Sequence, residues 1–420
     1  MKVGVISLGC AKNLVDTEVL LGKLKSSGAV IVSDPKKADV IIINTCSFIE
    51  PAKAESIDTI LEFAEKKKVI VMGCLVQRYK EELQKEIPEV SAYFGTESWD
   101  SILEFLRLKP KEDIKRILTT PKSYAYLKIS EGCNRLCSFC AIPIIRGRHR
   151  SRPIEEIVEE AKYLADQGVK ELCIVSQDTA YYGRDIYGKA HLIKLLQELE
   201  KVQGVKWIRL LYLYPTEVED GLLYYMADSE KVIPYLDIPL QHISTDVLKS
   251  MRRGYDENFV RKFLDKVMKV LPHAVLRTTF IVGYPSETAQ DFQKLLDFVQ
   301  EGHFHWVGVF TYYQEENTHA YALGDPIPMQ EKENRKEELL RVQKDITYKK
   351  NLDLVGKTLD LLVDGFDEEL GIVPVGRIYA QAPEVDGITY IEAEKQLKPG
   401  EVITVKITQA KDYDLVAQCL

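Results

Sequence analysis

Short apolar runs that alternate with amphipathic stretches constrain the fold of this chain more than any other sequence feature. Six runs have the length and composition of buried strands, and helical patterns such as residues 154–167 and 290–300 separate them. Strands that alternate with helices are parallel and are joined by right-handed crossovers. Because a complete barrel has eight such repeats, six predict an open or partial β/α barrel. The six runs are residues 124–129, 171–176, 208–213, 235–240, 275–282 and 307–312.

The first part of the chain has the same kind of alternation in a shorter form. Three apolar runs enclose two helical patterns, which predicts a βαβαβ unit with a parallel sheet. A charged connection flanked by prolines, residues 108–121, separates this unit from the central repeats. The runs are residues 2–9, 38–45 and 69–73, and the helical patterns are residues 13–27 and 51–67.

The last part of the chain changes character after a charged helical stretch, residues 330–350. Short β-rich runs stand between glycine and proline turns there, which predicts a small β-barrel. Residues 359–363, 388–392 and 402–407 are examples of these runs. We therefore expect an α/β protein with three domains, at residues 1–115, 122–350 and 352–420.

The most specific local signal is a CxxxCxxC loop after the first central strand, which contains Cys133, Cys137 and Cys140. Three thiolates this close in sequence can bind three irons of a [4Fe-4S] cluster, and one iron stays open because no fourth cysteine is near. A structural zinc site is the alternative, although such a site normally has four protein ligands. The spacing resembles the signature of the radical S-adenosylmethionine superfamily. That resemblance implies that S-adenosylmethionine binds the open iron and is cleaved to a 5′-deoxyadenosyl radical.

Three further cysteines, Cys10, Cys46 and Cys74, each stand at the end of an apolar run of the first domain. The carboxyl ends of parallel strands share one edge of a sheet, where ligands usually bind. Three thiols at that edge can hold a second cluster, but free cysteines are also often simply buried, and the residues alone leave both interpretations open. Cys173 lies within an apolar run and is interpreted as core. Cys419, next to the end of the chain, is interpreted as incidental.

The composition is that of an ordinary globular protein. Lys and Arg total 56 against 64 Asp and Glu, a net charge of −8, so no general attraction to nucleic acid or to an anionic membrane is expected. No segment supplies the roughly 18 apolar residues of a membrane helix, and residues 1–12 lack the pattern of a signal peptide. We therefore expect a cytoplasmic protein with no membrane partner. Because disulfides are rare in a reducing compartment, the positions of the eight cysteines are interpreted first as candidates for metal binding or catalysis.

Two cysteine sets, a central radical-type domain and a small terminal barrel resemble the methylthiotransferase family across essentially the whole chain. The terminal barrel resembles a TRAM domain. Four segments resemble the RimO branch of the family more than its tRNA-modifying branch: residues 7–13, 176–179, 182–185 and 239–242. The resemblance implies two [4Fe-4S] clusters, a radical-forming one on Cys133, Cys137 and Cys140 and an auxiliary one on Cys10, Cys46 and Cys74.

The resemblance also implies a reaction. Enzymes of the RimO branch methylthiolate the β-carbon of an aspartate in ribosomal protein S-twelve. By resemblance, the radical removes hydrogen from that carbon, the open iron of the auxiliary cluster presents the sulfur, and a second S-adenosylmethionine supplies the methyl group. Radical chemistry is reasonable because a side chain cannot easily remove a proton from so weakly acidic a carbon. An electron donor and a sulfur donor are implied as further partners, and the sequence identifies neither.

The charge of the terminal barrel provides a separate check on the substrate. Residues 351–420 contain six Lys or Arg and thirteen Asp or Glu, a net charge of −7. Such a surface repels RNA phosphates and suits a basic ribosomal protein. Charges that only keep a small barrel soluble would give the same count.

Loops at the carboxyl ends of the central strands are expected to surround the cofactor. Four residues in such loops are candidates to bind S-adenosylmethionine: Phe139, Gln177, Gln241 and Gly283. The glycine can permit close backbone approach to the cofactor, although a simple turn also explains it. The basic run at residues 146–152 is interpreted as a solvated face, unless its arginines line the cleft and guide an acidic group.

Two rival functions remain at this stage. A tRNA methylthiotransferase would use the same chemistry, but a basic terminal barrel would favour it. A non-catalytic iron–sulfur electron carrier or sensor would cleave no cofactor, and it would not need so large a βα scaffold.

Overall fold

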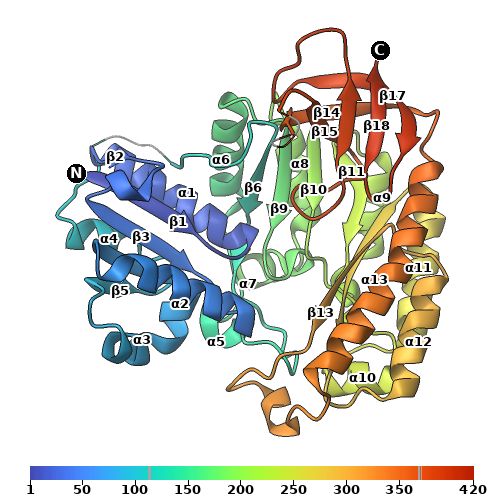
Figure 1. The fold of residues 1–420 in the computed structure, drawn as a ribbon. Coiled ribbons are helices and arrows are strands. Elements are labelled where there is room, and N and C mark those ends of the chain that lie inside the picture. Colours follow the sequence, from blue (N-terminus) through green and yellow to red (C-terminus); the bar gives the residue numbers. More distant parts are fainter. Residues whose placement is uncertain (112–114, 368, 370) are drawn as a thin grey trace. The chain divides into compact units, whose positions relative to one another are not determined.

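A computed structural model of the chain describes residues 1–111, 115–367, 369 and 371–420 (Figure 1). It separates into two compact units. The first consists of Met1–Thr119, Glu131–Arg135 and Ala141–His149, and the second of Thr120–Ser130, Leu136–Cys140 and Arg150–Leu420. Within the described residues, no helix is both long enough and apolar enough to cross a membrane.

The first unit contains a five-stranded, entirely parallel sheet with the strand order β2-β1-β3-β4-β5. From β1, the chain first adds β2 on one side and then adds β3, β4 and β5 on the other side, so the strand order reverses between β1 and β3. In such sheets, ligands bind outside the carboxyl ends of the strands at this switch point. The elements are β1 (Lys2–Ser7), α1 (Ala11–Ser26), β2 (Val30–Ile31), η1 (Pro35–Lys37), β3 (Val40–Thr45), α2 (Glu50–Ala64), β4 (Lys68–Gly73), α3 (Cys74–Glu86), β5 (Ala92–Phe94), α4 (Trp99–Phe105) and α5 (Ile142–Arg146).

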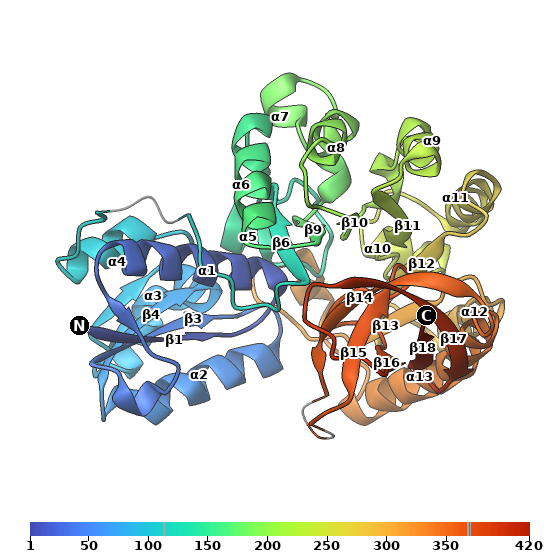
Figure 2. The ribbon, with the colours of Figure 1, turned by 90° about the horizontal axis from the view of Figure 1, so that it is seen from above.

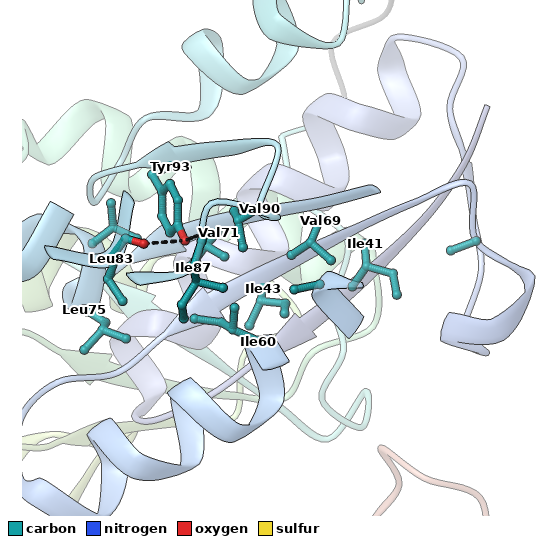
Figure 3. Close-up of a cluster of buried hydrophobic side chains, with 13 residues drawn as sticks. Ile41, Ile43, Ile60, Val69, Val71, Leu75, Leu83, Ile87, Val90 and Tyr93 are labelled. Carbon is teal, nitrogen blue, oxygen red and sulfur yellow. Dashed lines mark hydrogen bonds between the residues drawn. The ribbon is translucent and has the colours of Figure 1, made fainter. Parts of the chain in front are cut away.

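The sheet of the first unit has a hydrophobic core on each face because neighbouring strand residues point to opposite sides. Ile41 and Ile43 face α2 and α3, whereas Ile42 faces α1 and α4. Figure 3 shows the first of these cores, in which the Tyr93 hydroxyl donates to the backbone carbonyls of Leu83 and Ile87 at 3.0 and 2.8 Å. The predicted βαβαβ unit is thus a three-layer sandwich.

The second unit contains a six-stranded parallel sheet with the order β13-β12-β11-β10-β9-β6. Its strands are β6 (Tyr124–Lys128), β9 (Glu171–Val175), β10 (Trp207–Leu210), β11 (Val232–Asp237), β12 (Val275–Val282) and β13 (Trp306–Thr311). All six strands were predicted from the apolar runs, and no two of them close the sheet. The predicted α/β fold with a partial barrel is confirmed.

Helices cover the outer face of this curved sheet, and most successive helices pack side by side (Figure 2). The main ones are α6 (Ile154–Asp166), α8 (Leu192–Glu200), α9 (Asp220–Asp228), α11 (Glu257–Val270), α12 (Ala289–Gln300) and α13 (Met329–Leu352). Shorter elements are β7 (Ser130–Glu131), β8 (Arg150–Ser151), η2 (Thr179–Tyr181), α7 (Arg184–Tyr187), η3 (Pro215–Glu217), α10 (Thr245–Ser250) and η4 (His319–Leu323).

The end of the chain forms a closed five-stranded barrel, which confirms the small β-barrel predicted there. Its strand order is β14-β15-β16-β18-β17, and only β16 and β18 are parallel to each other. The strands are β14 (Thr358–Phe366), β15 (Pro374–Ile378), β16 (Thr389–Glu392), β17 (Val402–Ala410) and β18 (Leu415–Cys419).

This barrel is fastened to the amino-terminal edge of the six-stranded sheet by buried polar contacts. Glu171, the first residue of β9, accepts hydrogen bonds at 2.6 Å from both Arg209 of β10 and Arg377 of β15. The loop after β15 adds further contacts, since Glu384 accepts from the hydroxyls of Tyr124 and Tyr126 at 2.9 Å. The barrel therefore leaves the opposite, carboxyl edge of the sheet free of these contacts.

Candidate functional site

Three cysteines of the first unit follow three neighbouring parallel strands. Cys10 is the N-cap residue of α1 after β1, Cys46 comes directly after β3, and Cys74 opens α3 directly after β4. The strands pair in the order β1-β3-β4, so the three residues lie along one carboxyl edge, at the switch point of the sheet. The structure thus brings together the residues that the sequence placed at the strand ends.

The backbone around these cysteines is closely packed. A Cβ atom added at Gly9 would lie 2.9 Å from the Cys46 sulfur. The side chain of Asn13 contacts the segments that follow or end all three strands. Its amide N–H donates to the carbonyls of Leu8 and Thr45 at 3.0 and 2.9 Å, and its oxygen lies 3.6 Å from the Cys74 sulfur. One asparagine therefore fixes the three strand ends relative to one another.

The electrostatic environment indicates that the three thiols interact. Burial raises the pKa of Cys46, and the neighbouring Cys10 raises it further. Burial also raises the pKa of Cys74 to about 12, with Arg146 opposing and the other two cysteines adding to the increase. Without a bound metal, Cys46 and Cys74 are therefore neutral thiols at pH 7, and a metal ion would have to displace their protons.

Arg146, the last residue of α5, lies against Cys74. Its guanidinium donates to the Cys74 sulfur at 3.3 Å, to Asp16 at 2.8 Å and to Glu131 at 3.1 Å, and it also bonds the side-chain oxygen of Asn13. The arginine and Asp16 are each 2% exposed, so the cation is buried together with its carboxylates. The interpretation of residues 146–152 as a solvated face is wrong for this arginine, because the carboxylates of the first unit draw it inward.

The CxxxCxxC loop has two parts with their own local contacts. In the first unit, the Arg135 backbone donates to the Cys133 sulfur at 3.4 Å, and the Cys133 backbone donates to Gly147 at 3.1 Å. In the second unit, the Cys140 backbone donates to the Cys137 carbonyl at 3.1 Å, which forms a turn. Backbone N–H groups directed at sulfur or closing a turn are well suited to a loop of thiolate ligands.

A second buried arginine contacts this loop within the second unit. Arg253 is 5% exposed and donates to the Cys137 sulfur at 3.1 Å, to the Pro239 carbonyl at 2.7 Å and to the Tyr255 hydroxyl at 2.9 Å. Its guanidinium also lies 4.4 Å from the centre of the Tyr214 ring. Among the described residues, no carboxylate pairs with it. A buried cation beside a cysteine sulfur fits a loop whose thiols become anionic ligands.

The four candidate cofactor residues all lie in loops after central strands or in the cysteine loop. Phe139 packs, partly buried, against a cluster that includes Tyr284. Gln177 is partly buried and follows β9. Gln241 has a left-handed φ of 72°, and its backbone extends the pairing with β12 beyond the end of β11 through hydrogen bonds of 2.8 Å.

Gly283 is the fourth candidate, and the structure gives a packing reason for it. Its φ is 74°, and an added Cβ would lie 2.3 Å from the Lys332 side chain. The glycine therefore makes room for a fully buried lysine, which donates to the Tyr312 carbonyl at 2.9 Å and pairs with Asp325. Contact of any of the four with S-adenosylmethionine stays a prediction.

Sequence reasoning missed Asn13, Arg146 and Arg253 as parts of the site. In the sequence, Asn13 belongs to a segment that resembles the RimO branch, and Arg146 belongs to the basic run at residues 146–152. Arg253 has an exposed neighbour of the same type, Arg252, so nothing local distinguishes the two. The signal that could have been used is the position of the first two beside a cysteine motif.

Comparison with known proteins agrees with this architecture. Three family models match: Uncharacterized protein family UPF0004 over residues 2–95, the Radical SAM superfamily over residues 127–299, and the TRAM domain over residues 355–420. Among solved structures, the radical S-adenosylmethionine methyltransferase TsrM from Kitasatospora setae matches with a TM-score of 0.56 at 13% identity, covering 73% of this chain and 72% of that one. The cobalamin-dependent S-adenosylmethionine radical enzyme OxsB matches with a TM-score of 0.52 at 12% identity, covering 81% and 56%. These two likenesses concern the fold alone.

Curated relatives match over the whole length. The ribosomal protein uS12 methylthiotransferase RimO of Aquifex aeolicus is 66% identical over 100% of this chain and 97% of the relative. The proteins of the same name from Sulfurihydrogenibium sp. and Thermoanaerobacter sp. are 52% and 46% identical, with at least 99% of each chain covered. The chain therefore belongs to the RimO family of methylthiotransferases.

Proposed function

We propose that this protein is a radical S-adenosylmethionine enzyme that methylthiolates the β-carbon of an aspartate in ribosomal protein uS12. The observation that carries the proposal is the presence of two separate three-cysteine sets, one at the switch point of a parallel sheet and one in a CxxxCxxC loop, in a chain 66% identical to a RimO protein. Two sets are needed because radical formation and sulfur transfer are different tasks.

We assign one [4Fe-4S] cluster to each of the two three-cysteine sets. Cys133, Cys137 and Cys140 hold the radical-forming cluster, and Cys10, Cys46 and Cys74 hold the auxiliary one. Each set leaves one iron open to a non-protein ligand. When bound, the first cluster and S-adenosylmethionine supply a 5′-deoxyadenosyl radical, and the second cluster supplies the sulfur.

The chain's own residues prepare these sites. Asn13 keeps three strand ends in register, and Arg146 and Arg253 donate to one cysteine sulfur in each set at 3.3 and 3.1 Å. Hydrogen bonds to ligand sulfurs orient the ligands and stabilise their anionic form. Phe139, Gln177, Gln241 and Gly283 are assigned to the surroundings of S-adenosylmethionine, at the carboxyl edge of the six-stranded sheet.

We assign binding of the substrate protein to the acidic terminal barrel. The net charge of −7 over residues 351–420 favours a basic protein over RNA, and Glu369, Glu392, Glu394 and Asp412 are exposed there. The reaction is placed in the cytoplasm, where thiols stay reduced, and it requires an electron donor and a sulfur donor.

The test is anaerobic reconstitution with iron and sulfide, followed by reductant, S-adenosylmethionine and purified uS12. Replacement of one H by SCH3 should raise the substrate mass by about 46 Da. Cys10→Ser and Cys133→Ser should abolish this gain, whereas Cys419→Ser, a matched change near the end of the chain, should keep it.

Two other results would overturn parts of the proposal. Cleavage of S-adenosylmethionine with a mass gain on tRNA but not on uS12 would retain the chemistry and reject the substrate. Iron binding without any cleavage of S-adenosylmethionine would indicate an electron carrier or sensor.

A further inference from the structure

The two buried arginines that contact cysteine sulfurs differ in how their charge is balanced. Arg146 is paired with two carboxylates, those of Asp16 and Glu131. Arg253 has only neutral oxygen partners, the Pro239 carbonyl and the Tyr255 hydroxyl, besides the Cys137 sulfur. Within the described part of the chain, Arg253 is thus a buried cation with no carboxylate beside it.

A buried cation without an anion is strongly unfavourable, because it loses hydration and gains no opposite charge. The tyrosine rings at Tyr214 and Tyr255 lie 4.4 and 5.4 Å from the guanidinium and compensate only part of this cost. The one contacting group that can carry a full negative charge by binding iron is the Cys137 thiol. The sulfur is at hydrogen-bonding distance, 3.1 Å.

We propose that Arg253 is a positioning residue for the radical-forming cluster: it holds the Cys137 sulfur as a thiolate ligand and makes the cluster easier to reduce. This inference rests on the proposed function, which assigns Cys137 to that cluster. Reduction by one electron adds a negative charge to the cluster, so a fixed positive charge and an N–H···S hydrogen bond stabilise the reduced form more than the oxidised form.

The rest of the loop explains why the contact is rigid. Ser138 donates its backbone N–H to Met251 at 3.0 Å, two residues before the arginine, and its hydroxyl lies 2.8 Å from the Tyr284 hydroxyl. The Arg253 backbone is itself fixed by donation to the Leu248 carbonyl at 3.0 Å. Sulfur and guanidinium are therefore held by two segments that are hydrogen-bonded to each other.

The experiment compares Arg253→Gln and Arg253→Lys with Arg252→Gln, the same change at the exposed neighbouring arginine. All three are made in a full-length chain in which Cys10, Cys46 and Cys74 are replaced by alanine, so that one cluster gives the signal. Bound iron is measured first. The midpoint potential of the cluster is then measured by a redox titration with dithionite, followed by electron paramagnetic resonance of the reduced form.

For Arg253→Gln, we expect the ratio of oxidised to reduced cluster at a fixed potential to rise about tenfold, equivalent to a midpoint about 59 mV lower for one electron. Arg253→Lys, which keeps the positive charge, should show less than half of that shift in midpoint potential, and Arg252→Gln should show none. If Arg253→Gln binds too little iron to titrate, recovery of iron binding by Arg253→Lys supports the inference.

An unchanged midpoint in Arg253→Gln with full iron content would overturn the inference, as would an Arg253→Lys variant that behaves like Arg253→Gln. Neither result would touch the proposed function. Failure of the parent chain to bind a [4Fe-4S] cluster on Cys133, Cys137 and Cys140 would instead reject the cluster assignment itself.

Discussion

The buried carboxylate Glu171 gives the sharpest test of how the second unit is held together. Its side chain is fully buried and accepts one charge-assisted hydrogen bond from Arg209 and one from Arg377, both at 2.6 Å. Burial alone would raise its pKa, but the two arginines outweigh burial and hold the pKa below its ordinary value. Glu171→Gln keeps the volume and removes the charge that both arginines share.

The expected loss of stability in Glu171→Gln depends on the partners that each arginine keeps. Arg377 keeps Asp364, which accepts from it at 2.7 and 3.0 Å, whereas Arg209 keeps the Tyr379 carbonyl at 2.9 Å and the ring of Tyr235. One buried cation is thus left without an anion. Removing one partner of a buried ion pair costs about 3–5 kcal/mol, and this side chain has no solvent exposure that would reduce the effect.

Urea unfolding followed by tryptophan fluorescence measures this loss. Trp207 and Trp306 lie in the second unit, and Trp99→Phe removes the signal of the first. With m-values of up to about 3 kcal/mol/M, the midpoint of Glu171→Gln should fall by about 1–2 M. Glu198→Gln serves as the control, because that glutamate pairs with two lysines at the surface and should give no shift. If the two variants unfold at the same urea concentration, the ion-pair argument is refuted.

Two further outcomes follow from single residues. Burial lowers the pKa of His242 to about 3. As the pH falls from 6.5 to 5, the unfolded chain therefore takes up a proton at this histidine that the folded chain does not, and the free energy of unfolding should fall by about 2 kcal/mol. His242→Asn, whose oxygen can still accept from Ser244, should abolish this part of the pH dependence in urea titrations, and the exposed His273→Asn should not. Gly73 has a φ of 104°, and an added Cβ would lie 2.7 and 2.8 Å from backbone atoms of the strand that leads to Cys46. Gly73→Ala should therefore displace this strand end and prevent the proposed auxiliary cluster from binding, which would cut bound iron from roughly eight to roughly four per chain. Gly28→Ala, also at positive φ but with open space around it, should keep the iron content of the parent.

The layered fold could be predicted because hydrophobic periodicity determines it directly. The long strands and helices of both units carry that signal, and the structure contains them within a few residues of the predicted ends. The short strands β2 and β5 were missed, since two or three residues show no period, and the barrel strands β15 and β18 were not predicted individually. The network that fastens the barrel was also missed, because Glu171 and Arg377 are 206 residues apart and each looks like an isolated charge.

The site divides in the same way. Cys10, Cys46 and Cys74 could be placed together because parallel strands bring their carboxyl ends to one edge. The arginines could not, since Arg146 and Arg253 reach their sulfurs across 72 and 116 residues of sequence. The position of a cysteine at a strand end can be recognised from the sequence. The position of a charged side chain that tertiary packing brings to a cysteine sulfur cannot.

The contrast between the two arginines links the folding of the chain to its chemistry. Arg146 is neutralised by carboxylates of its own unit, so its burial is compensated whether or not a metal is bound. Arg253 has no carboxylate partner among the described residues, and a cysteine that binds iron binds it as a thiolate, so the proposed cluster on Cys137 would bring negative charge next to this arginine. Binding of the cluster should therefore stabilise the second unit more than its iron–sulfur bonds alone would, because it also relieves an unpaired cation. A chain without that cluster should tolerate Arg253→Gln better than a loaded one.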